Sequence, residues 1–357
     1  MKIRVAILDE DQNFLGRIAN AFSSRYPEDI EVYTFRDKKK ALTAIQEGNT
    51  RADLLLAGEG FEIDSKELPK HCGFAYFVDT PQVENLRGQK AICKFQKAEL
   101  IYKEMLALYA DADEIATKFL THGDREAVIL SFVSASGGTG SSSTAAACAK
   151  RLARANKKVL YLNLEQFGSS GDFFEAGGTF DLSDVIYAIK SHKSNLTVKL
   201  ESSVKHDISG VFFFDSCRMA FDVMEINPDD MNCLLEELKA LGKYDYIVVD
   251  MDFGFQKREV EVMKQAFRIV FVSDGTEIAN TKLKKGMDAL SVFEQQKELK
   301  LLPRVNLLYN KFASKTGQTL EDAEIKVLGG VPRLDGADTA QVVNHIAGMS
   351  VFDSFLM

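Results

Sequence analysis

The sequence AVILSFVSASGGTGSSSTAAA occupies residues 127–147 and changes character twice along its length. It begins as an apolar, β-branched run, passes through a loop of Ser, Gly and Thr, and ends in small residues that favour a helix. A strand, a glycine-rich turn and a helix N-terminus together present backbone N–H groups to an anion. The stretch therefore predicts a phosphate-binding loop.

This loop has the spacing of the pattern G-x-x-x-x-G-K-[ST] without its lysine. Ala135 stands at the first glycine, Gly140 at the second, and Ser141 and Ser142 follow. A lysine at that point normally meets part of the charge of a bound triphosphate. We expect the loop to bind phosphate through backbone donors, the helix N-terminus and Mg²⁺, with slow or absent hydrolysis.

Length and composition limit the class of protein. At 357 residues two domains are expected, and 46% hydrophobic with 27% charged residues is typical of a soluble globular protein. Five cysteines without a C-x-x-C pair indicate reduced thiols, and no signal peptide or membrane-spanning run is present, so we expect a cytoplasmic protein. A net charge of −8 argues against a broad nucleic-acid surface, and no specific nucleic-acid partner is expected.

The first half alternates short apolar runs with amphipathic segments, which is typical of a doubly wound α/β fold. Strands are expected at residues 3–8, 30–35, 53–57, 74–78 and 93–95, and helices at 14–22, 38–46 and 98–110.

This half resembles the receiver (flavodoxin-like) domain of bacterial two-component signalling. Asp9 and Glu10 follow the first strand where receivers hold magnesium-binding acids, and Lys94 precedes the last helix. The position of the phosphoryl-accepting aspartate aligns with Gly58, which cannot carry a phosphoryl group. We therefore expect an atypical, non-phosphorylated receiver, in which Asp9, Glu10 and Asp11 serve chiefly to cap the following helix.

The second half predicts another doubly wound, mostly parallel sheet, with the phosphate-binding loop on its first strand. Strands are expected at residues 127–133, 159–164, 211–214, 246–249, 269–273 and 305–309. Helices are expected at residues 143–155, 180–191, 228–241 and 339–346, and a further long helix follows the strand at 269–273 and ends at Lys297. We place the domains at residues 1–122 and 123–357.

Phosphate chemistry needs three further groups near the loop. The Ser142 hydroxyl is expected to ligate Mg²⁺, and Asp250, at the end of a strand, to hold the metal through water. Glu165 is the expected catalytic residue, positioning or activating the attacking water.

The loop, the NLEQFG segment at residues 163–168, the Asp250 strand and the NLLYNK strand at residues 306–311 resemble, in that order, the MinD/ParA group of deviant P-loop ATPases. The resemblance places that group's two loop lysines at Ser136 and Ser141, its adenine-contacting Asn at Asn310, and its base-packing segment at residues 332–333. It implies ATP and Mg²⁺ as ligands. The nucleotide-binding residues so implied are Ser136, Gly137, Gly138, Thr139, Gly140, Ser141, Ser142, Ser143, Asn310, Lys311, Pro332 and Arg333.

A basic residue elsewhere in the chain could substitute in space for the missing loop lysine. Arg258, Lys311 and Arg333 are the three candidates, and the sequence does not choose among them.

A receiver-like half joined to such an ATPase resembles the TadZ/CpaE family, which places tight-adherence (Flp-type) pilus machinery at a cell pole. The resemblance implies an ATP-binding homodimeric scaffold at the pole, contacting pilus secretion proteins and at most peripherally associated with the membrane. It would be at most a slow Mg-dependent ATPase. The alternatives are a cycling MinD/ParA-like ATPase that positions cargo on membrane or nucleoid, and a phosphorelay regulator, which Gly58 disfavours. The tail AGMSVFDSFLM (residues 347–357) has no basic residue and is expected in the core or at a partner contact.

Overall fold

A computed structural model of the chain separates into two compact units. Unit 1 comprises Met1–Thr121 with Ser191–Ser203, and unit 2 comprises His122–Lys190 with Val204–Met357. The structure describes residues 2–27, 29–46, 52–69, 72–112, 126–191, 196–313, 317–320 and 325–356. The predicted boundary between residues 122 and 123 lies outside these ranges and stays a prediction.

Unit 1 contains a six-stranded sheet in the order β2-β1-β3-β4-β6-β5. Its strands are β1 (Ile3–Leu8), β2 (Ile30–Phe35), β3 (Leu54–Gly58), β4 (Gly73–Val78), β5 (Asn85–Leu86) and β6 (Gln89–Cys93). All neighbours are parallel except β5 and β6. The strand expected at residues 93–95 ends at Cys93, because β6 begins earlier, in a hairpin with β5 that sequence periodicity did not indicate.

Helices cover both faces of this sheet. Helices α1 (Gln12–Arg25) and α3 (Ala98–Ala112) contribute buried side chains to one core, and α2 (Lys38–Gln46) contributes to the core on the opposite face. Between β3 and β4 the chain forms a 3-10 turn, η1 (Ser65–Glu67). The doubly wound α/β fold predicted for this half is confirmed.

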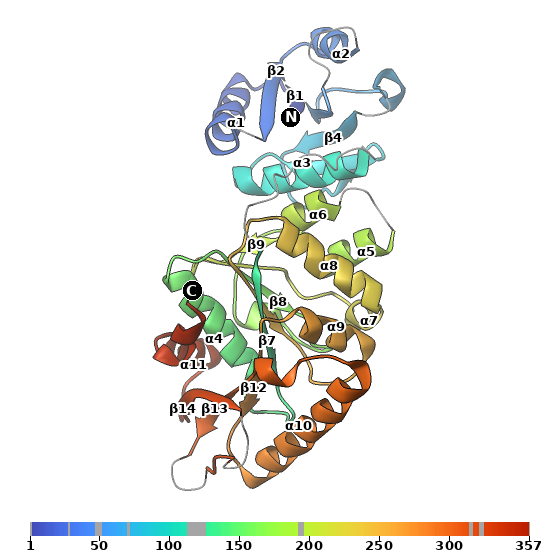
Figure 1. The fold of residues 1–357 in the computed structure, drawn as a ribbon. Helices are drawn as coiled ribbons and strands as arrows, with labels where there is room; N and C mark the ends of the chain where they lie inside the picture. The colour runs from blue at the N-terminus through green and yellow to red at the C-terminus, as the bar shows by residue number, and fades with distance from the viewer. Residues whose placement is uncertain are drawn as a thin grey trace. The chain divides into compact units, whose positions relative to one another are not determined.

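One element of unit 1 comes from the second half of the sequence. Helix α6 (Leu196–Ser203) packs on α3, and Val198 is buried in the same core as α1 and α3 (Figure 1). The sequence predicted no helix here and assigned the segment to the second domain. Its apolar positions alternate over too few residues to reveal which unit they pack against.

Unit 2 is built on an eight-stranded sheet in the order β14-β13-β12-β7-β11-β8-β10-β9. Its strands are β7 (Val128–Val133), β8 (Val159–Asn163), β9 (Lys205–His206), β10 (Val211–Phe213), β11 (Tyr246–Asp250), β12 (Arg268–Ser273), β13 (Val305–Phe312) and β14 (Lys326–Pro332). Only the β9–β10 pair is antiparallel, so the mostly parallel sheet predicted for this half is confirmed.

Strand register brings the site together. The β7 strand lies between β12 and β11, and β8 lies beyond β11. Asp250 is the register partner of Phe132 on β7 and of Asn163 on β8. Because parallel strands end at the same edge, the glycine-rich loop, Asp250 and the segment after Asn163 meet there.

Helices form a layer on each face of the unit 2 sheet (Figure 1). One layer contains α4 (Ser141–Arg154) and α11 (Thr339–Ala347), with η5 (Ser350–Phe355) beside them. The other layer contains α5 (Leu182–Lys190), α7 (Ala220–Met224), α8 (Pro228–Ala240), α9 (Lys257–Gln265) and α10 (Glu277–Lys297). The 3-10 turns η3 (Ser170–Asp172) and η4 (Leu302–Arg304) lie in connections.

The C-terminal tail belongs to the core of unit 2, one of the two places expected for it. Phe352 and Phe355 on η5 are buried among side chains of α4, α11 and the sheet. Edge strand β14 was not predicted, because its Gly329–Gly330 pair and its irregular register with β13 give it a weak strand signal.

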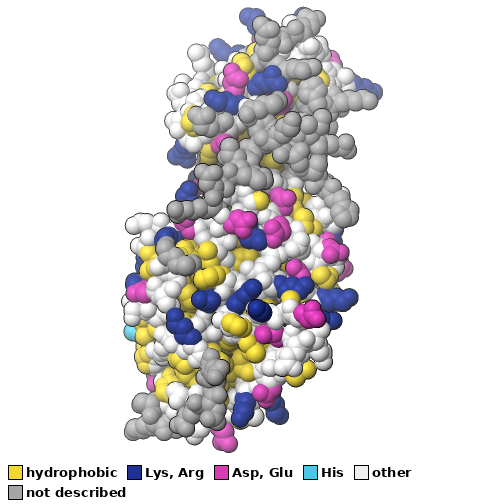
Figure 2. Space-filling model, in the orientation of Figure 1, with side chains coloured by type: hydrophobic (Ala, Val, Ile, Leu, Met, Phe, Trp, Pro, Cys, Tyr) yellow, Lys and Arg dark blue, Asp and Glu magenta, His cyan; other side chains and the backbone are white. Residues whose placement is uncertain are grey.

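The face of unit 2 seen in Figure 2 mixes basic, acidic and apolar side chains. Within the residues that the structure describes, no helix has both the length and the apolar character needed to cross a membrane.

Candidate functional site

The glycine-rich loop joins β7 to α4 through residues 134–140, and two of its glycines have left-handed backbones. Gly138 has φ 79° and Gly140, the N-cap of α4, has φ 83°. A Cβ atom at Gly140 would lie 2.4 Å from Asn310 Nδ2. Conformation and close approach therefore both require glycine at position 140.

Hydrogen bonds inside the loop hold its shape. The Ser134 hydroxyl lies 2.8 Å from the Ser136 carbonyl oxygen and 2.7 Å from that of Val272, and Thr139 Oγ1 donates to Ser134 Oγ over 2.9 Å. Thr139 is buried, so a ligand in the loop would meet its backbone rather than its hydroxyl. Sequence reasoning missed Ser134, since it precedes the motif positions.

Strand β13 supports the loop from the side. Asn310 Nδ2 donates to the Thr139 carbonyl over 2.8 Å, and Lys311 Nζ donates to the Gly138 carbonyl over 2.8 Å. Asn310 is buried at this contact. Its amide group therefore holds the loop, and the adenine contact expected for Asn310 stays a prediction.

Two carboxyl groups lie beside the start of α4. Ser142 Oγ donates to Glu165 Oε2 over 3.0 Å, and the Tyr161 hydroxyl donates to Asp250 Oδ2 over 2.7 Å. The other Asp250 oxygen, Oδ1, is buried and has no hydrogen-bond partner among the residues that the structure describes. An orphaned carboxylate oxygen in a polar site fits a cation or an ordered water.

Burial makes both carboxyl groups hard to ionise. Desolvation, with the nearby Glu165 charge, raises the pKa of Asp250 to about 8, despite the Tyr161 hydroxyl bond. Desolvation also raises the pKa of Glu165, and its bond from Ser142 only partly opposes this. A bound divalent cation would favour the ionised form of both groups.

Oxygen donors of this kind suit Mg²⁺, which takes one or two carboxylates and completes its shell with water and phosphate. Ser142 and Asp250 fit the metal-binding roles predicted for them. No cluster of three or more His, Cys, Asp or Glu side chains able to hold a metal occurs in the described part of the chain.

Two cavities adjoin at the loop. One, of about 380 Å³, is lined by the loop, the α4 N-terminus, Glu165 and the 251–253 segment, and the other, of about 540 Å³, by the ends of β13 and β14 and the 333–337 segment. Both are lined by Gly138, Ser143 and Lys311. An elongated ligand with an anionic end would occupy the two together.

The remaining predicted residues divide between these cavities. Ser136, Gly137, Ser141 and Ser142 line the loop cavity, and Pro332 and Arg333 line the other. Arg333 is exposed and pairs with Asp335 at 3.0 Å. Arg258 lies away from both: it is buried on α9, and its guanidinium donates to the Val223 carbonyl.

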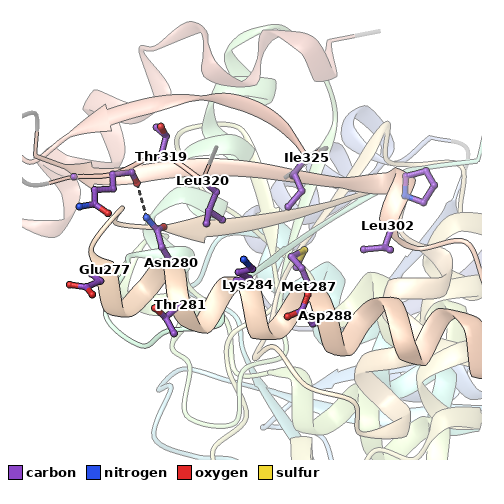
Figure 3. Close-up of a pocket in the computed structure, with 13 residues that line it drawn as sticks. Glu277, Asn280, Thr281, Lys284, Met287, Asp288, Leu302, Thr319, Leu320 and Ile325 are labelled. Atoms are coloured by element: carbon purple, nitrogen blue, oxygen red, sulfur yellow. Dashed lines mark hydrogen bonds between the residues drawn. The ribbon is translucent and has the colours of Figure 1, made fainter. Parts of the chain in front are cut away.

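A larger cavity, of about 1090 Å³, lies between α10 and residues 302–303, 317–320 and 325 (Figure 3). Asn280 on α10 donates to the Gln318 carbonyl across one end of it, over 2.7 Å. Its lining combines Glu277, Lys284 and Asp288 with apolar side chains and includes no glycine-rich loop at a helix N-terminus. Its size therefore does not make it the phosphate site.

In unit 1, Gly58 stands where a receiver carries its phosphoryl-accepting aspartate, and a side chain there would meet Asp9. A Cβ atom at Gly58 would lie 2.7 Å from Asp9 Oδ2. Lys94 Nζ lies 2.8 Å from Asp79 and 3.9 Å from Asp9. Burial alone would lower the pKa of Lys94, but these two carboxylates raise it overall.

The acidic run after β1 caps a helix, as expected. Asp11 is the N-cap of α1 and accepts from the Asn13 and Phe14 amides at 2.8 and 3.1 Å, and the Phe14 bond lowers the pKa of its carboxyl. Asp9 in turn accepts from the Asp11 amide at 2.8 Å.

Known structures share the fold of unit 2. A ParA family ATPase from Chlorobium tepidum TLS has 21% identity and a TM-score of 0.50, covering 64% of this chain and 95% of that one. A plasmid partition protein from Borrelia burgdorferi has 18% identity, a TM-score of 0.49 and coverage of 65% and 99%. MinD from Pyrococcus horikoshii OT3, complexed with Mg-ADP, has 20% identity and a TM-score of 0.47, covering 62% of this chain and 94% of that one. No curated protein matches by sequence.

Residues 1–110 match the TadZ-like receiver domain family. The second half has the fold of the ParA family ATPase from Chlorobium tepidum TLS. The chain thus joins a TadZ-like receiver domain at residues 1–110 to a domain with the ParA fold, as the sequence predicted.

Proposed function

We propose that this chain is an ATP-binding, homodimeric localisation scaffold for tight-adherence pilus assembly at a cell pole. The observation that carries the proposal is the glycine-rich loop with a polar cavity of about 380 Å³, which Glu165 and residues 251–253 also line. The TadZ-like receiver domain supports the pilus assignment. Bound nucleotide would stabilise the dimer by mass action.

ATP and Mg²⁺ are the proposed ligands. Ser142 and Asp250 would hold the metal, which would neutralise charge on the phosphates when bound. Glu165, whose raised pKa reflects its burial, would position water beside the terminal phosphate. Serine at positions 136 and 141 removes the cations that stabilise the transition state, so we expect slow hydrolysis.

The test compares wild-type protein with Ser141→Lys. We expect wild type to bind Mg-ATP, to form a dimer that persists for hours, and to release phosphate orders of magnitude more slowly than the variant. Sedimentation with and without Mg-ATP and a phosphate-release assay measure this. Absence of Mg-ATP binding would refute the proposal.

A second candidate is the cycling ATPase, favoured by Glu165, which lines the loop cavity and accepts a hydrogen bond from Ser142 Oγ. Fast phosphate release by wild type, with return to monomer as ATP is consumed, would support it. Co-purification of intact ATP would instead support the scaffold.

A further inference from the structure

We propose that Lys311 replaces the missing loop lysine from the opposite side, binding the two inner phosphates of a nucleotide rather than the terminal one. This inference rests on the proposed function, because it concerns the same site. It would explain how a loop without lysine keeps its ligand while losing most of its turnover.

Position is the first argument. Lys311 Nζ lies 2.8 Å from the Gly138 carbonyl, and Lys311 Cε would lie 3.5 Å from a Cβ atom at Gly140. The ammonium group therefore reaches the glycine-rich turn beside which a P-loop lysine normally binds phosphate. It comes from β13 rather than from α4.

Backbone conformation is the second argument. Lys311 has φ 55°, in the left-handed region that a lysine rarely adopts. The register between β13 and β14 shifts between Tyr309 and Phe312, so the chain is irregular where this side chain turns to the loop. Strained backbone of this kind gathers at ligand-binding sites.

The third argument is that Lys311 alone of the three candidate substitutes for the loop lysine has a side chain free to meet a phosphate. Arg258 is held at the Val223 carbonyl and beside Glu259, at 3.5 Å, away from the loop. Arg333 is paired with Asp335. Among the described residues no carboxylate pairs with Lys311, whose recorded bond is to a neutral carbonyl that a phosphate would displace.

The two cavities indicate which phosphates Lys311 would meet. Lys311 lines both, whereas Ser142 and Glu165 line only the loop cavity. A nucleotide with its base in the larger of the two would pass Lys311 with its inner phosphates and reach Glu165 with its outermost one. Lys311 would therefore serve ADP and ATP alike.

The experiment measures dissociation constants of Mg-ATP and Mg-ADP for the full-length chain. Lys311→Met should weaken both by about ten- to a hundredfold, as expected when a charge-assisted hydrogen bond is lost. Lys311→Arg should keep most of the affinity. Lys284→Met, on α10 at the separate cavity of Figure 3, is the charge-matched control and should bind as wild type.

A second variant guards against a folding artefact. Adding Ser141→Lys to Lys311→Met should recover affinity, since it supplies a cation to the same loop from α4.

Three results would overturn the inference. Equal binding by Lys311→Met and wild type would show that Lys311 plays no part while leaving the proposed function intact. Loss of ATP but not ADP affinity would place the ammonium at the terminal phosphate. Failure of wild type to bind either nucleotide would refute the proposed function, and this inference with it.

Discussion

The receiver site and the phosphate-loop site each lack the group that would perform their chemistry, but they differ in what surrounds the gap. At Gly58 the space for a side chain is closed, with Asp9 Oδ2 at 2.7 Å from a Cβ position. At Ser141 the loop borders a cavity of about 380 Å³, which Glu165 and residues 251–253 also line.

A side chain at position 58 would meet Asp9, whereas the loop at Ser141 has room beside it for a ligand. Lys94 at the receiver site is already neutralised by Asp79 and Asp9. Lys311 at the loop is bonded to a neutral carbonyl. Four variants, ordered by expected effect, test this contrast.

Of the four variants, Asp250→Asn should change the pH dependence of the free energy of unfolding the most. The folded chain holds a proton on Asp250 up to a pKa of about 8, against 3.8 for an ordinary aspartate, so it binds more protons than the unfolded chain between those values. The free energy of unfolding therefore falls as pH rises through that window, with a slope of up to about 1.4 kcal/mol per pH unit. Asn removes this slope.

Urea unfolding at several pH values, without magnesium, measures the slope of the free energy of unfolding against pH. The exposed Asp353→Asn is the control and should keep the wild-type slope. Parallel profiles for wild type and Asp250→Asn would show that the carboxyl is ionised in the folded chain.

Gly140→Ala should destabilise unit 2 by about 2–3 kcal/mol, from left-handed strain and loss of the Asn310 bond. It should also weaken Mg-ATP binding at least tenfold, because α4 and the loop meet at this residue. Gly137→Ala is the matched control for the loss of stability alone, since its Cβ position has no neighbour within 4 Å among the described residues. Comparable loss in both variants would mean that general loop flexibility, not the Asn310 contact, matters.

Gly58→Asp should not create a phosphorylated receiver. The new side chain would meet Asp9 Oδ2, so we expect about 2 kcal/mol of destabilisation from overpacking and no acetyl phosphate-dependent mass increase. Gly60→Asp, with its nearest neighbour, Glu10 Oε1, at 4.0 Å, should be nearly neutral. A stable phosphoryl group on residue 58 would contradict the closed-site description.

Val198→Ala should destabilise unit 1 by about 1.5 kcal/mol, because two buried carbons are lost at about 0.8 kcal/mol each. Hydrogen exchange of α3 peptides in the full chain should accelerate. Val292→Ala, the same deletion at a side chain 54% exposed on α10, is the control. Unchanged exchange in α3 would show that α6 contributes nothing to the receiver core.

The fold was predictable because its signals are local. Buried strands such as β1 and β7 are continuous apolar runs, and the loop before α4 has fixed glycine spacing. Strand β14 and helix α6 were missed, since their placement depends on partners far away in the sequence. The roles predicted for the site residues stay predictions.

The sequence alone determined two α/β halves, the absence of lysine at positions 136 and 141, and glycine at position 58, because these follow from residue identity and short-range periodicity. Only the tertiary structure decided that Gly58 faces Asp9, that Asp250 is buried with an orphaned oxygen, and that Lys311 rather than Arg258 reaches the loop. Distances between residues far apart in the chain, and the burial that shifts a pKa, arise only when strands from both ends of a domain align in one sheet.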